Sequence, residues 1–351
     1  MLKLIYTSLL TLLTPALANP IQSRQSASWP DPIPLSGNNT YIHDPSLIRR
    51  ADGTWFRFST LGNIAIASAP SLTGPWTYLG AMLPQGATMI NIHPQQELWA
   101  PDVFGVDGTY FAYYSVSRSG FQNSSIGVAT STTLEPGSWT DHGSIQIPHS
   151  SAYNIIDGNL FRECATCEPV FNFGSAWNDV YQTSLTSDFL SWSSTDGPRQ
   201  LLFNSTFPPG QDFRAIVEGS FLFWWPSAAD SSVKYYYLFF SSGQCCDFPS
   251  HRPEAGDEYK IMVCRATAAA GPFVDQEGRS CLTESGGTLV LGSHGGNVYA
   301  PGGQGVVVDP DDNKIALYYH YVDEDAGEEY ADYQFGINYL DFAMGWPVVV
   351  E

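Results

Sequence analysis

The 351-residue chain has few basic side chains: 15 Lys and Arg stand against 35 Asp and Glu, which gives a formal net charge of −20. This balance disfavours binding to nucleic acids and anionic membranes, because both attract basic surfaces. We therefore expect neither as a partner. Charged residues are only 14% of the chain, while aromatic residues make up another 14%. A high aromatic content favours stacked β structure, and exposed aromatic rings suit the faces of sugars.

Long apolar runs are also scarce. The basic start, a short apolar stretch and an Ala-x-Ala pattern at residues 16–18 are typical of a secretory signal peptide. The stretch is too short to cross a bilayer comfortably, and no later stretch is long and apolar enough. We predict that residues 1–18 are a signal peptide, that residues 19–37 form a flexible lead-in, and that residues 38–351 form a single secreted, extracellular and monomeric domain. Sequons that follow a signal peptide favour glycosylation, and three occur at Asn38, Asn123 and Asn204.

Cysteine is limited to six residues, an even number that favours disulfide bonds in an exported chain. A redox or zinc motif is the alternative for Cys164-x-x-Cys167. Since there is no second C-x-x-C and no adjacent βαβ pattern, we expect a local structural bridge. The remaining four are expected to form two bonds that join Cys245 and Cys246, in either order, to Cys264 and Cys281.

The chain lacks a convincing amphipathic helix pattern. Its 32 Gly and 24 Pro residues separate short runs that alternate or are β-branched and aromatic, which predicts an all-β fold. Aromatic strand segments recur five times, and the copies begin near Asp52, Asp107, Pro169, Lys234 and Lys314. Their spacing is longer than the ~40–50 residues of ordinary propeller blades, which indicates blades with long loops. We predict a five-bladed β-propeller.

Acidic side chains precede several of these aromatic segments. The innermost strand of a propeller blade lines the central channel, so residues far apart in the sequence meet at its mouth. We assign to innermost strands Asp44, Asp102, Asp157, Glu218 and Gln304. A single Asp before Pro is usually a turn or cap residue. Three carboxyl groups at matching places in a repeat, Asp44, Asp157 and Glu218, instead predict acid–base cleavage of a sugar chain.

Eight motifs in order make the chain resemble glycoside hydrolase family 43, and its endo-arabinanase branch in particular, over residues 40–350. They include His43-Asp44-Pro45-Ser46, Trp99-Ala-Pro-Asp102-Val, Tyr153-Asn-Ile-Ile-Asp157 and Val217-Glu218. The resemblance implies a five-bladed propeller that hydrolyses the α-1,5-linked arabinofuranose units of arabinan, a side chain of pectin, with inversion. It also implies Asp44 as general base, Glu218 as general acid, and Asp157 as the residue that tunes the acid's pKa. Inverting hydrolysis needs two such carboxyl groups, and a third nearby would raise the pKa of the acid.

The chain departs from the family pattern at three glycines. Gly158 replaces a common Pro after Asp157, and Gly219 replaces Ala after Glu218. Where many members read Gly-Pro-Gly-His and hold a cation or a water with the His, this chain reads Pro301-Gly-Gly-Gln304. We expect the chemistry to require no cofactor. A channel calcium ion would need a metal ligand such as His320 in place of the missing His; the alternative is a buried core histidine.

Further side chains are predicted to contact substrate: Trp99, Asn154, Ser175 and Trp177. For Trp99 the alternative is the core. Asp102 either binds substrate or braces the ring, and we favour bracing. His43 is expected to point away from the site, because side chains alternate along a strand.

Two other functions remain open. One is an exo-acting α-L-arabinofuranosidase or β-xylosidase of the same family, which the product profile on linear arabinan would distinguish. The other is a non-catalytic carbohydrate-binding propeller, to which the three glycine changes lend weight.

Overall fold

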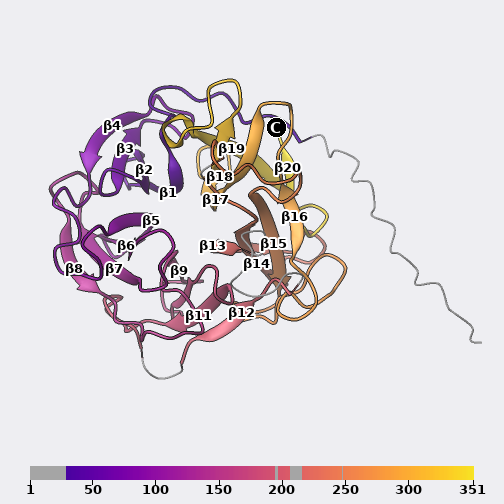
Figure 1. Cartoon of the computed structure of the whole chain (residues 1–351). Helices are drawn as coiled ribbons and strands as arrows, with labels where there is room; N and C mark the ends of the chain where they lie inside the picture. The colour runs from indigo at the N-terminus through magenta and orange to yellow at the C-terminus, as the bar shows by residue number, and fades with distance from the viewer. Residues whose placement is uncertain (1–28, 194–196, 206–215, 247) are drawn as a thin grey trace, which may run out of the picture.

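The computed structural model describes residues 29–193, 197–205, 216–246 and 248–351. In this part of the chain the strands form five four-stranded antiparallel sheets around a central axis (Figure 1). The predicted five-bladed β-propeller is therefore confirmed. The predicted signal peptide and residues 19–28 of the predicted lead-in lie outside the described residues.

Each blade is built from four consecutive strands, innermost first. Blade 1 contains β1 (His43–Arg49), β2 (Trp55–Thr60), β3 (Ala65–Ala69) and β4 (Thr77–Ala81). Blade 2 contains β5 (Glu97–Val106), β6 (Thr109–Ser117), β7 (Ser125–Ser131) and β8 (Thr140–Ser144). Blade 3 contains β9 (Asn159–Phe161), β10 (Val170–Phe173), β11 (Val180–Ser184) and β12 (Arg199–Leu202). Blade 4 contains β13 (Val217–Pro226), β14 (Lys234–Ser242), β15 (Lys260–Ala266) and β16 (Thr288–Leu291). Blade 5 contains β17 (Val298–Asp309), β18 (Lys314–Asp323), β19 (Gln334–Asp341) and β20 (Val348–Val350).

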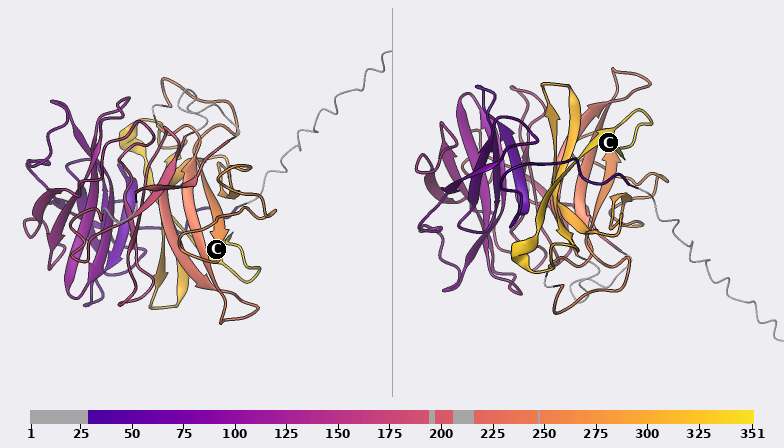
Figure 2. Two further views of the ribbon diagram at one scale, coloured as in Figure 1. Left: turned by 90° about the horizontal axis from the view of Figure 1, so that it is seen from below. Right: turned by 90° about the horizontal axis from the view of Figure 1, so that it is seen from above.

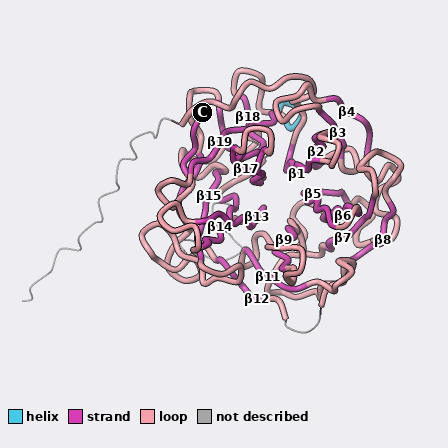
Figure 3. The backbone as a smooth tube through the Cα atoms, turned by 180° about the vertical axis from the view of Figure 1, so that it is seen from behind, coloured by secondary structure: helices cyan, strands magenta, loops and turns pink. Residues whose placement is uncertain are grey.

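Local turn chemistry explains where the strands reverse. Asp107 and Gly108 both have positive φ, 49° and 80°, as the two-residue turn between β5 and β6 requires. Among the described residues, helix is confined to short turns such as η2 (Tyr330–Asp332), drawn in cyan in Figure 3. None of the described helices has the length and apolar character needed to cross a membrane.

The apolar core is divided among the junctions between neighbouring blades. Phe58 of blade 1 packs in one cluster with Tyr114 of blade 2, and similar clusters fill the next three junctions. The fifth cluster joins the two ends of the ring, because it contains Trp55 of blade 1 and Tyr318 of blade 5. Burial of one such large apolar side chain contributes roughly 1.5–3 kcal/mol, so each junction holds its neighbours firmly in place.

Residues 29–42 also help to close the ring, and Figure 2 shows this indigo segment crossing the yellow strands of blade 5. The N–H of Ile33 donates to the carbonyl of Ile337 at 2.8 Å, and the N–H of Phe335 donates to the carbonyl of Asn39 at 2.8 Å. The expected flexible lead-in therefore differs from the structure over residues 29–37, because backbone hydrogen bonds hold this segment against the propeller.

Three disulfide bonds connect the six cysteines. The local Cys164–Cys167 bridge is confirmed. The predicted pairing of the other four is wrong, since the bonds are Cys245–Cys246 and Cys264–Cys281. Cys264 faces the buried core of blade 4, where Cys281 meets it, whereas Cys245 and Cys246 lie together in the loop after β14.

Candidate active site

Every blade carries at least one residue with a left-handed backbone at or just before its innermost strand. Five of these residues occupy matching places, one in each blade: Asp44 (φ 44°), Ala100 (φ 42°), Asp157 (φ 56°), Gly219 (φ 59°) and Gly303 (φ 58°). The pairing register shifts at this place in β1, β5, β13 and β17. Such β-bulges redirect side chains and interrupt the regular ladder. These four bulges and the bend at Asp157 surround the axis, so the five residues build the floor of a site.

The backbone N–H groups of four of these five residues donate hydrogen bonds to the preceding blade. The acceptor is a side chain on the second strand of that blade in every case. The pairs are Asp44 to His320 Nδ1 (3.0 Å), Ala100 to Thr60 Oγ1 (2.8 Å), Asp157 to Ser115 Oγ (2.9 Å) and Gly303 to Ser241 Oγ (2.9 Å). The fifth residue differs, because the N–H of Gly219 donates to Oδ2 of Asp157 at 3.0 Å.

Asp44 is surrounded by groups that stabilise its charged form. Its Oδ2 accepts hydrogen bonds from Thr60 Oγ1 at 2.9 Å and from His43 Nδ1 at 2.8 Å. Burial alone raises the pKa of Asp44, but His43, followed by His320 and Thr60, outweighs burial and lowers that pKa to about 2. Asp44 is therefore ionised over the ordinary pH range and can accept a proton.

The expectation that His43 points away from the site is wrong. The left-handed φ of Asp44 breaks the alternation of β1, so neighbouring side chains no longer face opposite sides. The His43 ring stacks on His320, with centroids 4.0 Å apart, and on Tyr330, with centroids 4.7 Å apart. Its side chain thus orients the carboxylate of Asp44.

Glu218 has the opposite electrostatic character. Its Oε2 accepts a 2.6 Å hydrogen bond from Ser175 Oγ, and its Oε1 accepts a 2.9 Å bond from the hydroxyl of Tyr259. Burial raises the pKa of Glu218, the two hydrogen bonds oppose that rise, and the charge of Asp44 adds to it. The net effect is a raised pKa, which keeps Glu218 protonated at higher pH than an exposed Glu.

Asp157 interacts with both of these groups. Burial, and then the charges of Glu218 and Asp44, raise its pKa well above the usual value, although the N–H of Gly219 opposes the rise. Because charge repulsion is mutual, Asp157 and Glu218 titrate as a pair. The pair thus resists losing both protons, which favours an acid at this position.

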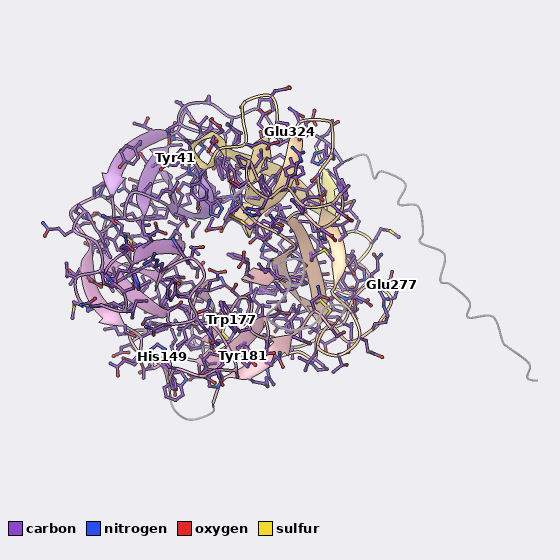
Figure 4. All side chains as sticks on the ribbon, viewed as in Figure 1. Tyr41, His149, Trp177, Tyr181, Glu277 and Glu324 are labelled. Carbon is purple, nitrogen blue, oxygen red and sulfur yellow. A yellow bond between two sulfur atoms is a disulfide. The ribbon has the colours of Figure 1, made fainter. Side chains whose placement is uncertain are left out.

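The three carboxyl groups line one cleft of about 680 Å³. The structure brings to the same cleft four of the predicted substrate contacts, Trp99, Asn154, Ser175 and Trp177. Trp99 is half-buried at the cleft and not in the core, and its Nε1 donates to Glu97 Oε2 at 3.1 Å. Trp177, labelled in Figure 4, comes from the loop between β10 and β11 of blade 3.

Asp102 braces the ring and lies outside this cleft. Its Oδ2 accepts the N–H of Leu160 at 2.8 Å, and its Oδ1 lies 3.4 Å from Nδ2 of Asn159. Equivalent bonds cross the adjacent junctions, where Ser46 accepts from Val103 and Asn159 accepts from Leu222. The geometry contradicts a direct substrate contact, because the buried carboxylate is engaged between blades 2 and 3.

The side chains present do not fit a cation at the position of the family's channel histidine. Gln304 stands there with both ends of its amide engaged: Oε1 accepts from Ser241 at 2.7 Å, and Nε2 donates to the carbonyl of Gly219 at 2.7 Å. His43, Asp44 and His320 do cluster within 4.8 Å. However, the Nδ1 lone pair of His320 already accepts the N–H of Asp44.

Sequence reasoning missed Thr60, Ser115 and Tyr259. A signal for the first two exists in the repeat, since a polar residue lies at or near the end of the aromatic strand in blades 1, 2, 4 and 5: Thr60, Ser115, Ser241 and His320. Tyr259 directly precedes β15 within the fourth repeat, but nothing in the sequence indicates that its hydroxyl reaches Glu218.

Among the predicted glycosylation sites, Asn38 and Asn123 are exposed. Asn204 is only 6% exposed, which argues against a glycan there.

Comparison with known proteins gives a consistent result. Residues 32–347 match the model of the family described as glycosyl hydrolases family 43. The chain belongs to this family. It is 52% identical to the probable arabinan endo-1,5-alpha-L-arabinosidase A of Aspergillus clavatus over 313 residues, 88% of this chain and 90% of that protein. It is 48% identical to the arabinan endo-1,5-alpha-L-arabinosidase A of Aspergillus aculeatus over 339 residues, 95% of this chain and 98% of that one.

A solved structure shows the same architecture. The Cellvibrio cellulosa alpha-L-arabinanase in complex with arabinohexaose superposes with a TM-score of 0.74 at 25% identity, covering 89% of this chain and 96% of that chain. The family 43 assignment therefore rests on sequence and fold together. The chain is a glycoside hydrolase with a five-bladed propeller.

Proposed function

We propose that this family 43 protein is a secreted endo-acting hydrolase that cleaves α-1,5-L-arabinofuranosidic bonds of arabinan. One observation carries the proposal: a single cleft holds one carboxylate whose pKa is lowered to about 2, Asp44, and one carboxyl group whose pKa is raised by burial, Glu218. Two acids whose surroundings push their pKa values apart are the acid and base pair of glycoside hydrolysis. The names of the two Aspergillus relatives support arabinan as the substrate.

In the proposed reaction Glu218 donates its proton to the glycosidic oxygen as the bond to the anomeric carbon breaks. Asp44 takes a proton from the water that attacks that carbon from the opposite face. The new hydroxyl group therefore has the inverted configuration. Asp157 titrates together with Glu218, so the pair retains one proton to a higher pH than an isolated exposed carboxyl group would. This chemistry uses side chains alone and requires no cofactor.

The cleft suits a chain of sugars. Loops of all five blades contribute to it, including Leu61–Asn63, Ser117–Phe121 and Tyr330. Its volume falls within the range of about 300–1,000 Å³ that is usual for sites enclosing ligands larger than one pentose. Three disulfide bonds support an oxidising, extracellular location.

Digestion of linear arabinan tests the proposal. Chromatography of early time points should show a ladder of arabino-oligosaccharides, since an endo enzyme cuts within the chain. Release of arabinose alone would mean exo action and would contradict the endo assignment. Binding of arabino-oligosaccharides without any release of reducing sugar would favour the non-catalytic alternative.

Two controls test the assigned residues. Glu218→Ala should lose about 10²–10⁴-fold in kcat, the usual contribution of a general acid. Proton NMR of the first product should show the anomer opposite to that of the substrate. Near-full activity of Glu218→Ala, or retention of configuration, would show that the assignment of the pair is incorrect.

A further inference from the structure

The disulfide bond between neighbouring residues Cys245 and Cys246 forms part of the cleft wall. Both sulfur atoms face one nitrogen of His43. Nε2 of His43 lies 3.2 Å from Sγ of Cys246 and 3.5 Å from Sγ of Cys245. Within the described residues, the other two disulfides are absent from the lining of this cleft, and Cys264 and Cys281 are fully buried in blade 4.

His43 has little freedom apart from movement in the plane of its own ring. The side chain is 6% exposed, and its two faces are occupied by His320 and Tyr330 at interplanar angles of 19° and 28°. Stacked rings resist tilting, yet they can slide past one another. In the plane of the ring, Nδ1 donates to Oδ2 of Asp44 at 2.8 Å, while the two sulfur atoms contact the ring at Nε2. The disulfide therefore stops the ring from sliding away from Asp44.

The disulfide is itself fixed to blade 4. The N–H of Gln244 donates to the carbonyl of Asp257 at 2.9 Å, and the N–H of Tyr259 donates to the carbonyl of Gln244 at 2.9 Å. The S–S bond closes a small ring across one peptide unit, so the two sulfur atoms cannot rotate independently. Two separate side chains would each populate several rotamers and would leave the edge of His43 unsupported.

We propose that the Cys245–Cys246 disulfide is a positioning element for hydrolysis, which acts through His43 on Asp44. The inference rests on the proposed function, because it assigns a task to a group beside the proposed base. The disulfide does not act on the reacting atoms. It holds His43, and His43 fixes the direction of the carboxylate that accepts the proton from water. Loss of the bond should lower kcat more than it changes KM.

A double-mutant cycle tests the pathway through His43. Cys245→Ala/Cys246→Ala should lower kcat on linear arabinan about tenfold, because small misplacements of a reacting group are costly. In a His43→Ala background the same double substitution should change kcat less than about twofold, since residues that act through one another are not additive. Removal of the Cys164–Cys167 bridge, as Cys164→Ala/Cys167→Ala, is the matched control and should leave kcat unchanged.

Reduction of the native bond gives an independent measurement if the double variant does not fold. In the Cys164→Ala/Cys167→Ala background, dithiothreitol delivers two electrons and two protons to the bond. The products are the thiols of Cys245 and Cys246 and the cyclic disulfide of dithiothreitol. A chelator is needed, because both sulfur atoms and His43 lie within 4.8 Å of one another and the freed thiols would bind zinc. Mass spectrometry after alkylation should show two labelled cysteines and the same loss of kcat, restored by reoxidation.

The outcomes separate the inference from the proposed function. Three results would each overturn the positioning role. They are an unchanged kcat after confirmed reduction, fully multiplicative losses of kcat in the double-mutant cycle, and a change in KM alone. In those cases the wild-type protein still cleaves arabinan, so the proposed function stands. A wild-type protein without activity on arabinan would overturn both.

Discussion

The N–H of Gly219 donates to Oδ2 of Asp157, whereas the equivalent N–H groups of the other four blades donate to the second strand of the preceding blade. The backbone N–H of Gly219, the residue after Glu218, is therefore bound by a carboxylate and not by a side chain of a second strand. Asp157 thus has two effects on Glu218, one through its charge and one through the backbone.

Substitution of Asp157 separates these two effects. Asp157→Asn removes one of the two titrating carboxyl groups and keeps an acceptor for Gly219, so the upper pKa of the coupled pair is lost. The basic limb of the pH profile of kcat/KM should move to lower pH, with a loss in kcat below the roughly 10²–10⁴-fold expected for the acid itself. Asp157→Ala also leaves the N–H unpaired and should lose more. An unshifted basic limb in Asp157→Asn would exclude an electrostatic role.

Tyr259→Phe should shift the basic limb of the pH profile of kcat/KM in the direction opposite to that of Asp157→Asn. The hydroxyl of Tyr259 stabilises the charged form of Glu218 and lowers its pKa, so its removal raises that pKa. The basic limb of kcat/KM should therefore move to higher pH, and kcat should fall modestly. Tyr78→Phe on the exposed strand β4 is the control. A shift to lower pH would contradict the hydrogen bond.

The acid limb of activity should lie unusually low. The pKa of Asp44 is lowered from 3.8 to about 2, so the base stays ionised where an ordinary Asp is already protonated. We expect kcat/KM to stay level through pH 3.8 and to fall only as pH approaches about 2. Pre-incubation at each pH, followed by assay at one pH, controls for unfolding. A reversible limb near pH 4 would show that His43 does not support Asp44.

Stability should decrease with rising pH, in part through Asp102 and Asp179. Burial is the largest cause that raises the pKa of each from 3.8 to about 7, so the folded state binds these protons more tightly than the unfolded state. The stabilisation is complete below pH 3.8 and is lost as pH rises through about 7. The thermal midpoint should thus be higher at pH 5 than at pH 8. Asp102→Asn, which keeps an acceptor but cannot ionise, should make this difference smaller and should leave KM unchanged.

Gly303→Ala should disable the site by steric conflict. A Cβ atom at Gly303 would lie 2.5 Å from Oδ1 of Asp44 and 2.6 Å from Nδ1 of His320. Since displacement of the base by about 1 Å can cost about 100-fold, kcat should fall sharply. Gly137→Ala is the matched control, because Gly137 also has a positive φ but open space around its Cβ position. Equal activity of the two variants would contradict the steric argument.

The sequence was sufficient to predict the five blades and the convergence of Asp44, Asp157 and Glu218. Both follow from a repeat that recurs along the chain, and the aromatic strands and turn residues mark it clearly. The glycine departures from the family pattern also have structural reasons. A Cβ at Gly158 would lie 2.5 Å from Phe171, and Gly219 adopts a left-handed backbone.

Other features could not be predicted, because they depend on contacts between blades. The direction of His43 depends on a bulge at Asp44, and alternation along a strand gives no warning of a bulge. Cys245 and Cys246 bond to each other in a loop that lines the cleft, whereas the core between blades 3 and 4 brings Cys264 to Cys281. The roles of Tyr259 and Thr60 likewise appear only when loops and blades are brought together.

The two ends of the ring meet at Asp44, the proposed catalytic base. Asp44 stands on the first strand of blade 1, and the side chain that accepts its backbone N–H, His320, belongs to blade 5, the last to be synthesised. A polypeptide that is still emerging, or one that has lost its final blade, carries all three carboxyl groups but cannot hold the first of them in place. If Asp44 is the base, as proposed, hydrolysis begins only when the two ends of the fold have met, and turnover reports completed assembly.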